Sequence, residues 1–313
     1  MRYILKKAAI FILTLLVISI LVFCAFQVIP GDPATRMLGT QATPEKVQLL
    51  REQLGLDAPG IVRYFSWLGG LLTGNLGTSY NYNMPVAELI SGKIAITAAL
   101  SLLSFGIVLL ISIPLGILLA RYANSLPDRM FMVINQLIMS IPPFFLGILF
   151  TYIFGLLLKQ FTPGDFVQHS VDPGGFWGYL FFPALAIALP KSAMVVKLLR
   201  TSMVKEMSED YVRTAFSRGN SRWQVLSKHV MRNAIIPVVT FLAVTLVDIV
   251  AGSIIIEQVF VIPGMGRLLL DSILKRDIPV AQTITMIIAA VVITVNYLAD
   301  ISYKYIDPRI RFR

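Results

Sequence analysis

Charged residues are scarce in this sequence. Only 14% of the 313 residues are Asp, Glu, Lys or Arg, whereas 56% are hydrophobic, and a soluble domain carries charge on about a quarter of its residues. The shortage is concentrated in long apolar runs, because residues 9–28 and 94–120 contain no charged side chain. Crossing the core of a bilayer takes about 20 apolar residues. The composition therefore predicts a polytopic membrane protein.

Other absences exclude several kinds of active site. Cys24 is the only cysteine, so neither a disulfide within the chain nor a cysteine metal cluster can form. The two histidines, His169 and His229, fall on opposite sides of the membrane in the topology given below. No phosphate-binding Gly-x-x-x-x-Gly-Lys-Ser/Thr loop is present, and the Ser, His and Asp residues show no recognisable catalytic constellation. We therefore expect a chain that is not an enzyme and that binds neither metal nor cofactor.

The apolar runs predict six membrane spans. The first could be mistaken for a signal peptide, but its apolar run is longer than the usual 7–15 residues and no small-residue cleavage site follows it. The fourth contains Lys191 and Lys197, and the fifth contains Asp248. The predicted spans lie near residues 9–29, 96–120, 131–157, 180–199, 235–256 and 281–302.

The formal net charge of +10 is explained by topology rather than by nucleic-acid binding. With six spans and the N-terminus inside, most of the 27 lysines and arginines lie on the cytoplasmic side. This is the positive-inside pattern of membrane proteins. The sequence therefore predicts that both termini are cytoplasmic.

The segment between the first two spans, residues 30–95, is predicted to form a small extracytoplasmic cap. Thr43 can cap a helix in which Pro44 takes the first position and Glu45 faces the positive end of the dipole. Gly55 is suited to end that helix. The cap either packs on the outer ends of the spans or also offers a docking surface to an external partner, and the two are compatible.

The predicted cytoplasmic segment of about 200–233 carries two predicted amphipathic helices. Ser208 can cap the first, and Gly219 is suited to end it. Ser221 and Gln224 have the capping-box spacing at the start of the second. Two short helices of this kind are not stable alone in water, so they must dock. Periodicity leaves open whether they lie on the membrane interface or insert into a cytoplasmic partner.

Several short motifs follow one another along almost the whole chain. They are Asp210-Tyr211-Val212-Arg213-Thr214-Ala215-Phe216-Ser217-Arg218-Gly219 with His229 and Arg232-Asn233-Ala234, and, elsewhere, Gly31-Asp32-Pro33, Leu54-Gly55-Leu56-Asp57, Pro114-Leu115-Gly116, Ser140-Ile141-Pro142-Pro143, Arg200-Thr201-Ser202-Met203, Ile256-Glu257, Pro263-Gly264-Met265-Gly266 and Asp307-Pro308-Arg309. Together these motifs resemble the permease subunits of ABC importers, and within them the dipeptide, oligopeptide and nickel branch. The segment of about 200–233, which we call the coupling loop, differs from the general importer pattern in having Arg213-Thr214-Ala215 where that pattern has Glu-Ala-Ala, and in the late position of Pro237.

The resemblance implies an assembly in a bacterial or archaeal cytoplasmic membrane. Two related permeases would enclose a pathway, with two cytoplasmic ATPase subunits below and an extracytoplasmic substrate-binding protein above. ATP and Mg²⁺ would be bound by the ATPases and not by this chain. Closure of the ATPases would pull on the coupling loop and favour an outward-open state, to which the loaded binding protein would have to bind more tightly.

The resemblance also implies a coupling helix over residues 209–218 that rests in a groove of an ATPase subunit. Exposed apolar side chains would supply contact, Arg213 and Arg218 would supply charged hydrogen bonds, and Gly219 would permit the turn back to the membrane. The predicted coupling residues are Glu209, Asp210, Tyr211, Val212, Arg213, Thr214, Ala215, Phe216, Arg218 and Gly219.

A few other residues have two interpretations each. Asp248 lies within a span, where an ionisable group suggests a functional site, but it could also hydrogen-bond between helices or pair with Lys191 or Lys197. Glu257 could line the exit from the binding protein or shape the turn before Pro263. Asp300 is expected to form a local pair with Lys304. Proline residues at 114 and at 142–143 are expected to kink or interrupt spans, or to reflect irregular packing.

The sequence thus predicts an all-α membrane protein in three parts: residues 1–29, residues 30–95, and a five-helix permease core over residues 96–313. The expected function is ATP-driven import of short peptides. The alternatives are import of nickel or another small chelated solute by the same machine, and a secondary carrier driven by an ion gradient.

Overall fold

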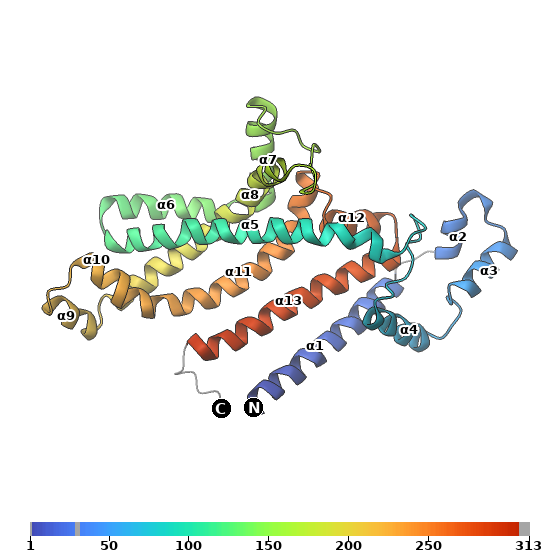
Figure 1. Cartoon of the computed structure of the whole chain (residues 1–313), viewed down its shortest axis with the longest axis horizontal. Helices are drawn as coiled ribbons and strands as arrows, with labels where there is room; N and C mark the ends of the chain where they lie inside the picture. Colours follow the sequence, from blue (N-terminus) through green and yellow to red (C-terminus); the bar gives the residue numbers. More distant parts are fainter. Residues whose placement is uncertain (1, 29–31, 307–313) are drawn as a thin grey trace. The chain divides into compact units, whose positions relative to one another are not determined.

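The computed structural model describes residues 2–28 and 32–306 (Figure 1). Its described residues are predominantly helical and contain no strand, only an isolated bridge between Thr78 and Pro85. Within these residues, five helices are long and apolar enough to cross a membrane, and a bent pair of helices supplies a sixth if it counts as one span. The predicted all-α membrane class is confirmed. Gly31 and the Asp307-Pro308-Arg309 motif lie outside the described residues.

Five of the predicted spans correspond to long helices. The fourth is longer than predicted at both ends because amphipathic turns, which a search for apolar runs does not detect, extend the apolar stretch. The helices are α1 (Arg2–Gln27), α5 (Val86–Arg121), α8 (Pro173–Glu206), α11 (Met231–Val259) and α13 (Ile278–Ile306).

The third predicted span is broken. Helix α6 (Leu126–Ser140) and the following α7 (Pro143–Phe150) with η2 (Thr151–Leu157) meet at a bend of 93°, and Figure 1 shows α7 turned away from α6. A residue that precedes proline is pushed out of the helical region, and two residues here precede prolines in succession. Ile141 and Pro142 are accordingly extended, with ψ of 122° and 140°. The predicted interruption at 142–143 is confirmed, whereas Pro114 lies inside the continuous helix α5.

Contacts divide the chain into two compact units, residues 1–96 with 264–294 and residues 97–263 with 295–313. The three-part division expected from the sequence stays a prediction. In the first unit, α1 packs on α4 (Gly60–Thr73). The hydroxyls of Ser19 and Tyr64 lie 2.8 Å apart, and the ring of Phe23 contacts those of Tyr64 and Trp67.

The cap contains the predicted helix and further helices that were not predicted. Helix α3 (Pro44–Gln53) begins after Thr43, whose hydroxyl accepts a bond from the amide of Lys46, and Gly55 follows it with φ +63°. The other short elements of this unit are α2 (Pro33–Leu38), η1 (Gly39–Gln41), α4 and α12 (Met265–Leu274).

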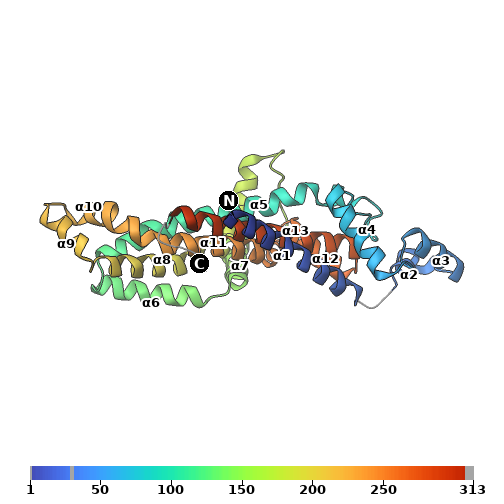
Figure 2. The same cartoon turned by 90° about the horizontal axis from the view of Figure 1, so that it is seen from below.

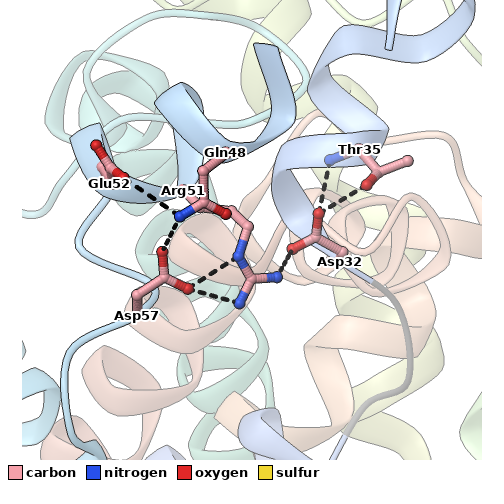
Figure 3. Close-up of polar contacts among 6 residues, drawn as sticks. All are labelled: Asp32, Thr35, Gln48, Arg51, Glu52 and Asp57. Atoms are coloured by element: carbon pink, nitrogen blue, oxygen red, sulfur yellow. Dashed lines mark hydrogen bonds and ion pairs between the residues drawn. The ribbon is translucent and has the colours of Figure 1, made fainter. Parts of the chain in front are cut away.

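Charged side chains fasten the cap internally (Figure 3). The guanidinium of Arg51 lies 2.9 Å from Asp32 and 2.8 Å from Asp57. Burial raises the pKa of Asp32, but hydrogen bonds from Thr35 and the charge of Arg51 outweigh that effect, so the net pKa lies below the usual value. Arg51 thus ties the start of α2 to the turn after α3.

The turn between α12 and α13 is fastened to the residues that precede α5. The carboxylate of Asp277 is fully buried and accepts hydrogen bonds from the Ser79 hydroxyl and from the amides of Tyr80 and Asn81, the latter two at 3.0 and 3.3 Å. An ionised group without water needs such partners. This one carboxylate therefore fixes the loop before α5 within the first unit.

Helix α8 is the centre of the second unit. It contacts α6, α7 and α11, and Figures 1 and 2 show α6 running alongside it. Helix α5 packs closely against α8 at Gly116, which has no side chain. A Cβ added at Gly116 would lie only 2.7 Å from Leu199 Cδ2 of α8. Most of the buried apolar side chains of this unit belong to α8 and α11.

Candidate functional site

The predicted coupling helix is present as α9 (Asp210–Ser217). It lies at one end of the second unit, next to α10 (Arg222–Gln224) (Figure 1). Glu209 is the N-cap residue, and Ser208, predicted to be the cap, instead donates its hydroxyl to the carbonyl of Lys205 at 2.7 Å. Gly219 follows α9 with φ +79°, a conformation in which other residues are strained, so the predicted stop is confirmed.

The second predicted helix begins where expected but is not short. Ser221 and Gln224 form the reciprocal capping box. From there α10, the π-helical turn η3 (Val225–Val230) and α11 follow without a gap, as one helical run over Arg222–Val259. The first of the two short helices is therefore present, but the expectation of a short second helix is wrong. That second helix is the beginning of the fifth span.

Helix α9 is docked on this run through two of the residues expected to be exposed. Val212 and Ala215 retain only 1% and 5% exposure, and α9 contacts η3. Asn220 donates from Nδ2 to the carbonyl of Ala215 at 2.9 Å. The expectation that Val212 and Ala215 would be free for a partner is wrong, because this chain already covers them.

The opposite surface of the loop is open. Tyr211 and Phe216 are 37% and 40% exposed, and Trp223 is 49% exposed. The side chain of Arg213 is 79% exposed and lies 3.7 Å from that of Asp210, which is 98% exposed. Arg218 is the C-cap residue of α9. The loop therefore exposes aromatic rings and cationic groups on one side, while its other side packs on η3.

Tyr211 is less free than the other exposed side chains. Its hydroxyl donates to Glu206 Oε2 at 2.6 Å. Burial and this hydrogen bond raise the pKa of Tyr211 to about 12, against a smaller opposing effect from Asn233. The phenol therefore stays neutral and links α9 to the end of α8.

Three basic residues at successive positions along α8 bind side chains of the neighbouring helices α6 and α11. Lys191 Nζ lies 2.6 Å from Asp248 Oδ2 on α11, and Lys197 Nζ donates to Gln136 Oε1 on α6 at 3.0 Å. Arg200 binds the buried Asp128 with two bonds of 2.7 and 2.5 Å. Of the partners considered for Asp248, the structure selects Lys191.

Glu257 is fully buried near the end of α11. It accepts a hydrogen bond of 2.5 Å from the Thr97 hydroxyl, and its carbonyl accepts the amide of Ile262 at 2.8 Å, within the turn that leads to Pro263. This arrangement favours the turn-shaping interpretation. No group of three or more potential metal ligands is found among the described residues, and the side chains of Asp300 and Lys304 lie outside what the structure describes.

Comparison with known proteins agrees with this architecture over the full length. The family model described as binding-protein-dependent transport system inner membrane component matches residues 112–312, and the model of the N-terminal part of such membrane components matches residues 1–101. A putative peptide transport system permease protein of Brucella abortus (strain 2308) is 37% identical over 309 residues, which cover 99% of this chain and 98% of that protein.

Two further proteins bear on the comparison. The glutathione transport system permease protein GsiC of Salmonella paratyphi A is 36% identical over 313 residues, with 100% of both chains covered. A chain from the inward-facing MetNI methionine ABC transporter has a TM-score of 0.57 at 16% identity, covering 70% of this chain and 96% of that one, and supports the fold alone. The chain therefore belongs to the family of binding-protein-dependent transport system inner membrane components, the permease subunits of ABC importers.

Proposed function

We propose that this chain, paired with a second related permease, forms the pathway through which an ABC importer admits short peptides. The observation that carries the proposal is the 37% identity over 99% of the chain with a protein named as a putative peptide transport permease. As a member of this family the chain is a membrane protein that works with an ATPase and a binding protein. We propose two ATPase subunits, which alone bind ATP and Mg²⁺.

The named relatives favour peptides over nickel or another chelated solute. Peptide transport is named for the relatives from Brucella abortus and Sinorhizobium fredii, and glutathione, named for GsiC, is itself a tripeptide. A carrier driven by an ion gradient is not retained, because the family consists of ABC importer permeases. The substrate is therefore placed among short peptides and their derivatives.

We assign the coupling role to the exposed side of α9. Tyr211, Arg213 and Phe216 would contact the ATPase, while Glu209, Asp210, Thr214, Arg218 and Gly219 shape and charge the helix. Val212 and Ala215 act differently from the sequence expectation, because their buried packing on η3 fastens α9 to α11. A displacement of α9 by the ATPases would therefore move the span that follows it.

The proposal also includes an orientation of the chain in the membrane. The coupling loop faces the cytoplasm, the cap and Glu257 lie towards the outer side, and both termini are cytoplasmic in a bacterial or archaeal inner membrane. The positive-inside distribution supports this orientation.

Co-purification tests the proposal. The tagged chain is extracted gently from its native membrane, and we expect an ATPase subunit, a second permease and peptide-stimulated ATP hydrolysis in the presence of the binding protein. Phe216→Ala combined with Arg213→Glu should release the ATPases while the second permease remains. Val171→Ala, which alters an exposed apolar residue outside the loop, is the matched control. A chain that is always recovered alone, or hydrolysis that peptides never stimulate, would contradict the proposal.

A further inference from the structure

An ion pair sits in the middle of two membrane spans. Lys191 lies near the midpoint of α8 and Asp248 near the midpoint of α11. Lys191 Nζ and Asp248 Oδ2 are 2.6 Å apart, but the burial of the two side chains is unequal, at 19% exposure for Lys191 and 52% for Asp248. The lysine is therefore held within the protein, and the carboxylate is half open to whatever lies beside it.

A half-open carboxylate at this depth does not face lipid. Ionised side chains at the centre of a bilayer are costly, and they are found facing a bundle interior or a water-filled cavity. The described residues of this chain leave that face of α11 uncovered. We therefore infer that the face receives water, a solute or another polar surface.

The same open face continues across α8. At 100° per residue, the buried residues of α8 between 192 and 203 lie on one side, and the exposed Lys197, Thr201 and Lys205 lie on the other. Lys191 and Lys197 stand at the two margins of this open side, the first next to α11 and the second next to α6. On α11, one exposed stripe at helical spacing includes Asp248 and consists of Thr240, Val244, Asp248, Ala251, Ile255 and Gln258.

The two charged groups on this face retain binding capacity. Among the described residues Asp248 uses only Oδ2, so its second oxygen can accept further hydrogen bonds. Lys197 donates to the neutral amide of Gln136, and in the part of the chain that the structure describes no carboxylate forms an ion pair with it. The face thus offers an acceptor for an ammonium group and, separately, a cation for a carboxylate.

We propose that this open face binds a zwitterionic solute, with the free amino group of a peptide at Asp248 and its carboxylate at Lys197. The inference rests on the proposed import of short peptides and identifies where the substrate is held. Lys191 acts as a positioning residue that holds the carboxylate of Asp248 in place through the ion pair. Lys191 and Lys197 are about 9 Å apart along the helix axis, the length of about three residues of an extended peptide.

Uptake by the reassembled importer in liposomes, with labelled trialanine, tests the site. Asp248→Asn should lower uptake at least tenfold, with the second permease and the ATPases still bound, and Lys197→Gln should lower it as well. The reversed pair Lys191→Asp with Asp248→Lys keeps an ion pair but presents a cation, so it should not restore uptake. Asp165→Asn, on an exposed loop carboxylate, is the control for charge removal and should match the wild type.

Each failure has a separate meaning. No trialanine uptake by the wild-type complex overturns the proposed function itself. Wild-type uptake that survives Asp248→Asn, or that the reversed pair restores, overturns the binding site and leaves a structural ion pair. Loss of the second permease from Asp248→Asn also overturns it, since the face would then be a subunit contact.

Thiol labelling provides a second measurement with the ion pair intact. Cys24→Ser removes the only cysteine, and Ala251→Cys places a thiol about one turn from Asp248. A membrane-impermeant thiol reagent should label this position, and trialanine should slow the labelling several-fold. Leu110→Cys, on a 76% exposed position of α5, should stay unlabelled. Labelling that trialanine leaves unchanged contradicts the site.

Discussion

Asp128 shows what a single buried charge requires in this protein. Its side chain is 1% exposed and receives both bonds of the Arg200 guanidinium, together with the amide of Asn124 at 2.8 Å. Paired bonds from one guanidinium are stronger than neutral hydrogen bonds and fix its orientation. The start of α6 is thereby tied to α8.

Removing this carboxylate should be costly. Asp128→Ala leaves Arg200 without its partner, and breaking a buried pair from one side costs about 3–5 kcal/mol. We expect a clearly lower melting temperature in detergent. Arg213→Ala, at an exposed pair of 3.7 Å, should change stability by less than about 1 kcal/mol. Equal effects of the two substitutions would contradict the structure.

The cap should loosen in acid because of Asp32. Its net pKa lies below the usual value of 3.8, so the folded state favours the ionised form, and the stability gained is present above that value and lost as the pH falls through the lower, folded pKa. Hydrogen exchange in α2 and α3, corrected for intrinsic rates, should rise over that range. With Arg51→Gln the rise should begin at higher pH. Identical profiles for the two proteins would count against this account.

At the scale of elements, two glycines of α5 provide a matched pair. A Cβ on Gly116 would lie 2.7–3.0 Å from three atoms of Leu199, whereas one on Gly106 would meet nothing within 4 Å. Gly116→Ala should destabilise by about 1–3 kcal/mol, the usual cost of overpacking. Gly106→Ala should be neutral or stabilise by up to about 1 kcal/mol. Thermal unfolding of both variants checks the pair, and the opposite order would refute the α5–α8 contact.

Helices with strong local signals could be predicted from the sequence. The packing of one helix on another could not. Thr43, Gly219 and the Ser221 capping box each act within a few residues, so they are visible in the chain itself. Helix α4 is not among the predicted helices, although Ile61, Phe65, Leu68 and Leu72 recur at helical spacing and provide a signal for it. The π-helical continuity from α10 into α11 carries no such mark.

The candidate sites divide in the same way. The helix predicted over residues 209–218 is present as α9, and its coupling role stays a prediction. The sequence pattern assigns the buried side of this helix to a partner, because periodicity identifies an apolar face without identifying what covers it. For Asp248, spacing left several partners open, since Lys191 and Lys197 lie on the same helix, and only the packing of α8 on α11 distinguishes them.

At the scale of the whole molecule, the bend at 142–143 decides the topology. If α6 and α7 with η2 form one span, the chain has six and its ends lie on the same side, whereas five spans would place them on opposite sides. We expect six. A fluorescent protein fused to the C-terminus should fluoresce in the cytoplasm, and a phosphatase inserted near residue 165 should be active outside. An active phosphatase at the C-terminus would exclude the six-span arrangement.

The unbroken helical run over Arg222–Val259 has a mechanical consequence. The run begins next to α9, whose exposed side is the proposed ATPase contact, and contains Asp248 further along, with the π-helical turn η3 and Pro237 between them. A torque applied at α9 would turn Asp248 relative to Lys191 on α8. The ATPase cycle would then separate and re-form the Lys191–Asp248 ion pair. The two orientations of α11 would be the states that bind and release the peptide.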